Sequence, residues 1–143
     1  MVLVGLDLGE KRIGVSVSDK EGLFAHPRPA IVCSKGEQHK KLVELMLIER
    51  PAEIVIGHPL ELSGMRGERA IWVEKFCDKL RGHFSAHLEL RGVKLTLWDE
   101  RLSSVQAERA LIAAGHSGAK LKSMTDSLAA TIILESYLSK RVS

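Results

Sequence analysis

The chain opens with Val2-Leu3-Val4-Gly5-Leu6-Asp7-Leu8-Gly9, and this stretch decides the fold. A short apolar segment closed by glycine is typical of a buried β-strand. A carboxylate inside such a strand is costly unless it is paired or holds a metal ion. The run contains no Lys, Arg or His that would neutralise Asp7. An acid that caps a turn at the strand end is the alternative, but we expect Asp7 to be a site residue because two more acids stand in equally apolar settings.

The composition is typical of one globular domain. The 143 residues are 45% apolar and 27% charged, so we expect 1–143 to form a single domain around its own core. No apolar run reaches the roughly 18 residues of a membrane helix, and no signal peptide is recognisable, so we expect a cytoplasmic protein without membrane contact. Cys33 and Cys77 lack CxxC spacing and are expected to be buried free thiols. The formal charge of +3 weakly favours an anionic partner.

The order of predicted elements indicates an α/β fold. Apolar runs and alternation predict strands over 2–9, 12–18, 22–33, 53–57 and 93–98. The third is expected to be a broken or edge strand because it contains Pro27 and Pro29. Helical periodicity predicts helices over 36–50, 67–90, 103–115 and 125–139, with a basic loop over 116–123. This order predicts a mixed sheet with helices on both faces.

Two further acidic positions accompany Asp7. Asp99 and Glu100 fall on opposite faces of the strand that follows Gly92, and the pattern alone does not decide which of them faces the site. Asp126 begins the apolar stripe of the last predicted helix, which continues with Ala129, Ala130, Ile133 and Tyr137. A first-turn acid that complements the helix dipole is the alternative explanation for Asp126.

Carboxylates that converge without a counter-ion repel one another. Two unit charges about 4 Å apart repel by on the order of 4 kcal/mol at an effective dielectric constant of about 20. A divalent ion removes this repulsion, and ligation by carboxylates and water favours Mg²⁺ or Mn²⁺ over zinc. Because such ions activate water and stabilise a leaving oxygen, the acids predict metal-dependent hydrolysis of phosphodiester bonds.

Four motifs occur in order and span nearly the whole chain. They are Gly5-Leu6-Asp7-Leu8-Gly9-Glu10-Lys11-Arg12-Ile13-Gly14-Val15-Ser16-Val17-Ser18-Asp19, Ile56-Gly57-His58-Pro59-Leu60, Asp99-Glu100-Arg101-Leu102-Ser103-Ser104 and Thr125-Asp126-Ser127-Leu128-Ala129-Ala130. Together these motifs resemble those of the YqgF (RuvX) family. The resemblance implies an RNase H-like fold, a five-stranded mixed sheet flanked by helices. It also implies that Asp7, Glu100 and Asp126 are both the catalytic residues and the metal ligands, with Asp99 in a structural role.

The resemblance implies a divalent-metal-dependent endonuclease. Members of the family resemble RuvC-type Holliday-junction resolvases and are described as nucleases that mature the 5′ end of precursor 16S rRNA. We favour processing of this structured RNA, with cleavage of branched, four-way DNA junctions as the close alternative. A non-catalytic RNA-binding factor of ribosome assembly is a further alternative. An ATP-binding protein of the actin or sugar-kinase type is disfavoured because that architecture needs two such domains. The sequence leaves open whether the protein is a monomer or a homodimer.

Basic residues flank the predicted site. Lys11 and Arg12 follow the first strand, Arg101 follows Glu100, and Lys120 and Lys122 precede the last predicted helix. We expect these five, as a set around the acids, to contact substrate phosphates, although any one of them alone is better explained as a solvated surface charge. The start of the helix over 67–90 extends this basic rim with two arginines, Arg66 and Arg69.

The loop after the fourth strand departs from the family pattern. Glu61 stands where the family usually has Asn, so it is either a fourth carboxylate that contacts substrate at the rim of the site or a solvated loop residue. His58 in the same loop is a candidate proton donor or phosphate contact, although most loop histidines are neither. These departures bear on substrate preference rather than on the reaction.

Overall fold

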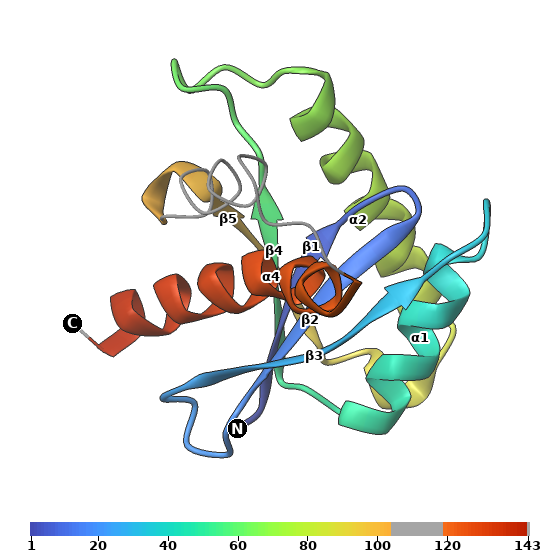
Figure 1. The fold of residues 1–143 in the computed structure, drawn as a ribbon. Helices are drawn as coiled ribbons and strands as arrows, with labels where there is room; N and C mark the ends of the chain where they lie inside the picture. Colours follow the sequence, from blue (N-terminus) through green and yellow to red (C-terminus); the bar gives the residue numbers. More distant parts are fainter. Residues whose placement is uncertain (104–118, 143) are drawn as a thin grey trace.

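The computed structural model describes residues 1–103 and 119–142, and beyond Ser103 it describes side chains from Ser127 to Arg141. Its centre is a five-stranded sheet in the order β3-β2-β1-β4-β5 (Figure 1). The strands are β1 (Leu3–Leu8), β2 (Arg12–Ser18), β3 (Ala25–Val32), β4 (Glu53–His58) and β5 (Lys94–Asp99). β1, β2 and β3 are antiparallel neighbours, whereas β1, β4 and β5 run parallel. The predicted mixed sheet is confirmed, and β3 with its two prolines is an edge strand as expected.

Helices cover both faces of the sheet, as predicted. Helices α1 (Gln38–Glu49) and α2 (Glu68–Ser85) pack on one face, and α4 (Ala119–Val142) crosses the other (Figure 1). The short helices η1 (Leu88–Leu90) and η2 (Glu100–Leu102) flank β5. Within the described residues, no helix combines the length and apolarity that crossing a bilayer requires.

The alternation of β1 assigns its side chains to two separate cores. Val4, Leu6 and Leu8 belong to the core beneath α1 and α2, and Leu3 belongs to the core beneath α4. Successive side chains of a strand point to opposite faces, so Asp7 lies on the face that α4 covers. The first acid of the chain is therefore directed toward the helix that carries Asp126.

Helix α4 approaches the sheet closely because it packs against a glycine of β1, Gly5. A Cβ atom on Gly5 would lie 2.8 Å from the Ala130 carbonyl oxygen and 2.8 Å from Leu134 Cβ. The Ser16 hydroxyl, on the neighbouring strand, donates to the Ala130 carbonyl oxygen at 2.8 Å. One turn earlier, the Ser127 hydroxyl donates to the Arg28 carbonyl oxygen of β3 at 2.5 Å. These contacts fix the height of α4 above β1, β2 and β3.

Two predicted helix boundaries are wrong. Helix α2 ends at Ser85 rather than at 90, because the chain leaves the helix to bury Leu90, which is 1% exposed, while Leu88 remains exposed. Helix α4 begins at Ala119, so the end of the predicted 116–123 loop is helical. Ala, Leu and Lys all favour helix, and the segment after Gly118 contains neither Gly nor Pro. The predicted helix over 103–115 lies outside the described residues after Ser103.

The close packing of α4 predicts opposite effects for two Gly-to-Ala substitutions. Gly5→Ala is expected to lower the free energy of unfolding by about 1–3 kcal/mol, because the methyl group must displace the α4 backbone. Gly82→Ala, on α2, is expected to raise it by about 0.5–1 kcal/mol, because nothing lies within 4 Å of the added Cβ. Urea unfolding of both variants measures this, and equal effects would contradict the packing described for α4.

Candidate functional site

Two acids meet at one edge of the sheet. Asp7, half-buried, lies near the carboxyl end of β1, and Glu100, only 2% exposed, directly follows β5. β4 lies between these two strands and runs parallel to both. Because the carboxyl ends of parallel strands meet at the same edge, this arrangement places both acids on that edge.

Gly57 of β4 accommodates the buried carboxylate of Glu100. A Cβ atom on Gly57 would lie 2.6 Å from Glu100 Oε1 and 2.6 Å from Ile133 Cδ1. Ile133 belongs to the core beneath α4, so Glu100 lies on the same side of the sheet as Asp7. The face assignment that the strand pattern left open is thereby decided in favour of Glu100.

Asp99 is engaged in an ion pair outside this carboxylate cluster. The Arg101 guanidinium donates to both Asp99 oxygens, with its shortest contact at 2.7 Å, and the Arg101 backbone N–H donates at 2.9 Å. The Arg101 side chain holds the pKa of Asp99 below its usual range. Arg101 also donates to the Leu62 carbonyl oxygen at 3.3 Å and so connects β5 to the loop after β4. The Arg101 guanidinium, which was expected to contact phosphate, is therefore engaged in contacts that hold the end of β5 to the loop after β4.

The third predicted acid, Asp126, lies in α4, and its side chain lies outside the described residues. The next residue, Ser127, is 1% exposed and accepts a hydrogen bond from the Val15 backbone N–H at 3.3 Å. Val15 follows Gly14, which pairs with Asp7 across the β1–β2 ladder. The backbone at position 126 is therefore close to the part of the sheet that carries Asp7.

The described carboxylates fit a hard divalent cation. Glu100 and Asp7 offer oxygen donors, the preferred ligands of Mg²⁺ and Mn²⁺, and Gly57 leaves space for the Glu100 carboxylate. Among the residues whose side chains are described, no group of three or more His, Cys, Asp or Glu is arranged to hold a metal. The three-carboxylate set therefore stays a prediction, because its third member is Asp126.

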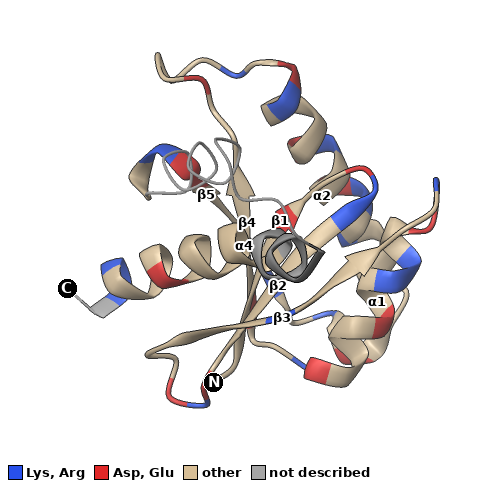
Figure 2. Ribbon diagram, in the orientation of Figure 1, with Lys and Arg blue, Asp and Glu red and all other residues tan. Residues whose placement is uncertain are grey.

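The other predicted phosphate contacts occupy two places. Lys11 and Arg12 are exposed at the tight turn between β1 and β2, where Figure 2 shows acidic and basic positions together. Lys120 and Lys122 lie in the first turns of α4, and their side chains lie outside the described residues. Arg69 donates to the Leu8 carbonyl oxygen, so it supports the end of β1.

Glu61 is exposed and lies against the start of α2. A Cβ atom on Gly67, the residue that caps α2, would lie 2.7 Å from Glu61 Oε1. A carboxylate near a helix N-terminus is stabilised by the helix dipole. This contact gives Glu61 a structural role at the start of α2. The substrate contact that the sequence left open for Glu61 stays a prediction.

A three-residue cluster that the sequence did not predict fixes the ends of the loop after β4. His58 Nε2 lies 2.7 Å from Glu74 Oε2, and Arg66 Nε donates to the same carboxylate at 2.9 and 3.0 Å. Arg66 first, and His58 second, lower the pKa of Glu74 to about 2. The three residues span 58–74, so no local spacing rule could have joined them.

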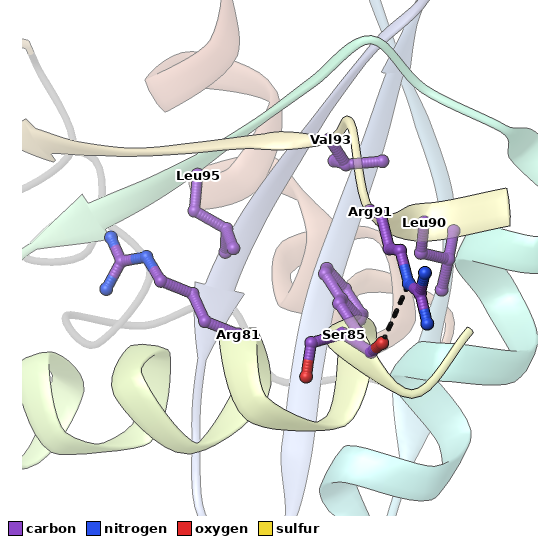
Figure 3. A pocket seen from close by; sticks show the side chains of 7 residues that line it. Arg81, Ser85, Leu90, Arg91, Val93 and Leu95 are labelled. Carbon is purple, nitrogen blue, oxygen red and sulfur yellow. Dashed lines mark hydrogen bonds between the residues drawn. The ribbon is translucent and has the colours of Figure 1, made fainter. Parts of the chain in front are cut away.

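A small cavity lies away from the acids. It has a volume of about 230 Å³ and is lined by Arg81, Phe84, Ser85, Leu90, Arg91, Val93 and Leu95 (Figure 3). The Arg91 side chain donates to the Ser85 carbonyl oxygen across its wall at 3.1 Å. Val93 and Leu95 stand at the amino end of β5, whereas Glu100 follows its carboxyl end. This cavity is therefore separate from the carboxylate site.

Comparison with solved structures shows that this architecture has the RNase H-like fold. Thermus thermophilus RuvC in complex with Holliday-junction substrate superposes with a TM-score of 0.55 and 17% identity, covering 99% of this chain and 96% of that chain. The Fowlpox virus resolvase in complex with junction DNA gives a TM-score of 0.56 and 11% identity, covering 100% of both chains. At these identities the likeness establishes the fold alone, and it confirms the predicted RNase H-like fold.

The chain belongs to the RuvX family. The family model described as "RuvX: Holliday junction resolvase" matches residues 1–140. A relative from Geobacillus kaustophilus is 41% identical over 144 residues, which cover 99% of each chain. Another from Carboxydothermus hydrogenoformans is 39% identical over 142 residues, which cover 96% of each chain. Both relatives carry the name "Putative pre-16S rRNA nuclease".

The Glu74 cluster predicts a pH-dependent contribution to stability. Glu74 titrates at about 2 in the folded protein, against an ordinary value of 4.5, so it stabilises the fold above pH 4.5 and loses this effect as the pH falls toward 2. Glu74→Gln is therefore expected to lower the urea midpoint most above pH 4.5, with a difference that shrinks in acid. Arg66→Ala removes the main partner of the Glu74 carboxylate, so in this variant the effect of Glu74→Gln on the urea midpoint is expected to depend less on pH. A wild-type-minus-variant difference that is constant from pH 6 to pH 2 would contradict the assignment.

Proposed function

We propose that this protein is a divalent-metal-dependent endonuclease that processes the 5′ end of precursor 16S rRNA in the cytoplasm. The observation that carries the proposal is the position of Glu100, a buried carboxylate set against Gly57 on the same face and edge of the sheet as Asp7. The rRNA substrate is supported by relatives about 40% identical along the whole chain whose names include that activity.

In this proposal Asp7, Glu100 and Asp126 hold a Mg²⁺ or Mn²⁺ ion. The bound cation supplies a Lewis acid for a phosphodiester oxygen and offsets the negative charge that develops during hydrolysis. The protein contributes by holding the carboxylates that would bind this cation in place. Gly57 and Ile133 confine the Glu100 carboxylate, and the packing of α4 on Gly5 sets the distance of its helix from Asp7.

The substrate contacts are assigned to side chains at the edge of the site. Lys11 and Arg12 at the β1–β2 turn and Lys120 and Lys122 at the start of α4 are proposed to bind phosphates of structured RNA. Arg101 is proposed to act mainly through Asp99, since its guanidinium is held in that ion pair and against the Leu62 carbonyl. Glu61 is proposed to shape the rim beside α2.

Cleavage of a four-way DNA junction is the second candidate function. It is favoured by the likeness to RuvC and Fowlpox resolvase complexes with junction DNA, and by the resolvase description of the family model. The same carboxylates would perform either reaction, because both hydrolyse a phosphodiester bond. The shape and charge of the surface around the acids therefore decide the substrate.

Substitution of the acids tests the assigned roles. Asp7→Asn and Glu100→Gln are expected to lower the cleavage rate by on the order of 10²–10³-fold, the loss typical of removing one group that stabilises transition-state charge. Asp99→Asn is expected to retain most of the rate, because Asp99 pairs with Arg101 instead. Single-turnover cleavage assays, with circular dichroism to confirm folding, measure these effects. An inactive but folded Asp99→Asn beside an active Glu100→Gln would reverse the assignment.

A substrate comparison separates the candidate functions. The wild type and Asp7→Asn are incubated with Mg²⁺ or Mn²⁺ on RNA that carries the 5′ extension of precursor 16S rRNA, and on a four-way DNA junction. We expect metal-dependent cutting of the RNA that is lost in the variant and after chelation with EDTA. Symmetric cutting of the junction alone would make the protein a resolvase. Equal RNA binding by both proteins without any cutting would leave a non-catalytic assembly factor.

A further inference from the structure

A large basic cavity lies beside the turn that follows β1. It has a volume of about 760 Å³ and is lined by Glu10, Lys11, Arg12, Val32, Cys33, Ser34, Lys35, Gln38 and Trp72. We call it the hairpin cavity. Pockets that bury small ligands have volumes of about 300–1,000 Å³, so this volume is suited to a ligand the size of one nucleotide.

The walls of the hairpin cavity are tied together by hydrogen bonds. The Cys33 backbone N–H donates to the Lys11 carbonyl oxygen at 2.8 Å, and Gln38 Nε2 donates to the Glu10 carbonyl oxygen at 2.9 Å. On the remaining side, the Arg69 guanidinium lies 4.4 Å from the centre of the Trp72 ring and also donates to the Leu8 carbonyl oxygen. The cavity is therefore a formed part of the fold that is fastened to the end of β1.

The lining of the hairpin cavity suits a phosphate that carries an apolar group. Three cationic side chains and one carboxylate line it, which gives it a net positive charge. Lys11 and Lys35 are exposed and able to reach a bound anion. Val32 is 57% exposed on the cavity wall, and Trp72 contributes aromatic surface. Val32 and Trp72 therefore offer apolar surface to a sugar or base.

The hairpin cavity and Asp7 are both part of the β1–β2 hairpin. Asp7 pairs with Gly14 across the β1–β2 ladder, and Arg12 stands two residues before Gly14 on the same face of β2. At a strand rise of about 3.3 Å per residue, Arg12 lies roughly 7 Å from Gly14 along β2, toward the turn. Gln38 of α1 and Trp72 of α2 line the cavity from the side of the sheet opposite to Asp7, so a nucleic-acid strand that crosses Asp7 reaches the cavity by passing around the β1–β2 turn.

We infer that the hairpin cavity binds one nucleotide of the substrate strand, outside the carboxylate site. Lys11 and Lys35 hold its phosphate, and Val32 and Trp72 contact its sugar and base. This inference rests on the proposed nuclease function and adds a specific binding position to it. It also gives Lys35 and Trp72 a role in substrate binding.

Metal-free binding tests the cavity independently of catalysis. Fluorescence anisotropy of a labelled single-stranded RNA is measured with wild type, Lys35→Ala and the control Lys20→Ala, which removes an exposed lysine from the β2–β3 turn. Lys35→Ala is expected to weaken binding several-fold and to reduce the slope of log K against log salt by about 0.7, the effect of one lost phosphate contact on a single strand. Lys20→Ala is expected to change neither.

Tryptophan fluorescence locates the bound nucleotide. Trp72 and Trp98 are the two tryptophans of the chain, so Trp98→Phe leaves Trp72 as the sole reporter. RNA is expected to change the Trp72 emission saturably, and Lys35→Ala should shift the midpoint to higher RNA concentration. Adenosine monophosphate is added as a competitor. A response to the mononucleotide that does not weaken RNA binding would assign the cavity to a separate small ligand and overturn the inference.

Cleavage of truncated substrates distinguishes this inference from the proposed function. Nucleotides are removed one by one on each side of the cleavage position. Lys35→Ala is expected to raise KM, with kcat unchanged, only for substrates long enough to fill the cavity. If the wild type cuts every substrate and Lys35→Ala matches Lys20→Ala in all assays, the inference is wrong and the function stands. If the wild type cuts nothing but Lys35 still governs binding and Trp72 emission, the function is wrong and the cavity still binds a nucleotide.

Discussion

The close approach of α4 to two glycines of the sheet is the contact on which the candidate site depends. Gly5 leaves no room for a side chain beneath Ala130 and Leu134, and Gly57 leaves none beneath Ile133. A methyl group at either position would have to move the helix backbone or the Glu100 carboxylate. Since Asp7 and Glu100 are fixed on the sheet, the position of the helix that carries Asp126 is set by this packing. The position of α4 relative to the two described acids is therefore a consequence of close packing against the sheet.

The arginines around the site stabilise its frame. Arg101 joins Asp99 to the Leu62 carbonyl, Arg66 holds Glu74, and Arg69 joins the end of β1 to Trp72. Each guanidinium presents several donors in a fixed plane, which suits it to hold two partners at once. Phosphate binding is then assigned to Arg12 and to lysines, whose single flexible charges adapt to a moving backbone. The arginines that are held in ion pairs thus keep the surroundings of the site in place, and the remaining cations adapt to the substrate. Such an arrangement suits recognition of nucleic acid by its shape and charge.

Local patterns predicted most of the fold, and long-range contacts explain what they missed. Strand alternation separated Asp99 from Glu100 correctly, but both faces of the sheet are covered by helices, so alternation could not identify the face of the site. The decisive contact, Glu100 against Gly57, joins the residue that follows β5 to β4. The pairing of His58 with Glu74 and the exit of the chain from α2 to bury Leu90 are likewise tertiary effects. The role of Asp126 stays a prediction.

The β1–β2 turn links the carboxylate site to the hairpin cavity. A side chain on Gly9 would collide with the Arg12 carbonyl oxygen, so the turn is held tight. Asp7 precedes this turn and Lys11 lies within it, so the acid and the cavity wall keep a fixed separation. A nucleotide seated in the cavity would then set which phosphate reaches Asp7. An enzyme that must cut a long RNA at one position needs such a fixed reference, because the phosphodiester backbone itself is uniform along the strand. In this proposal, the β1–β2 hairpin joins the carboxylate site to a binding position that selects the phosphate to be cut.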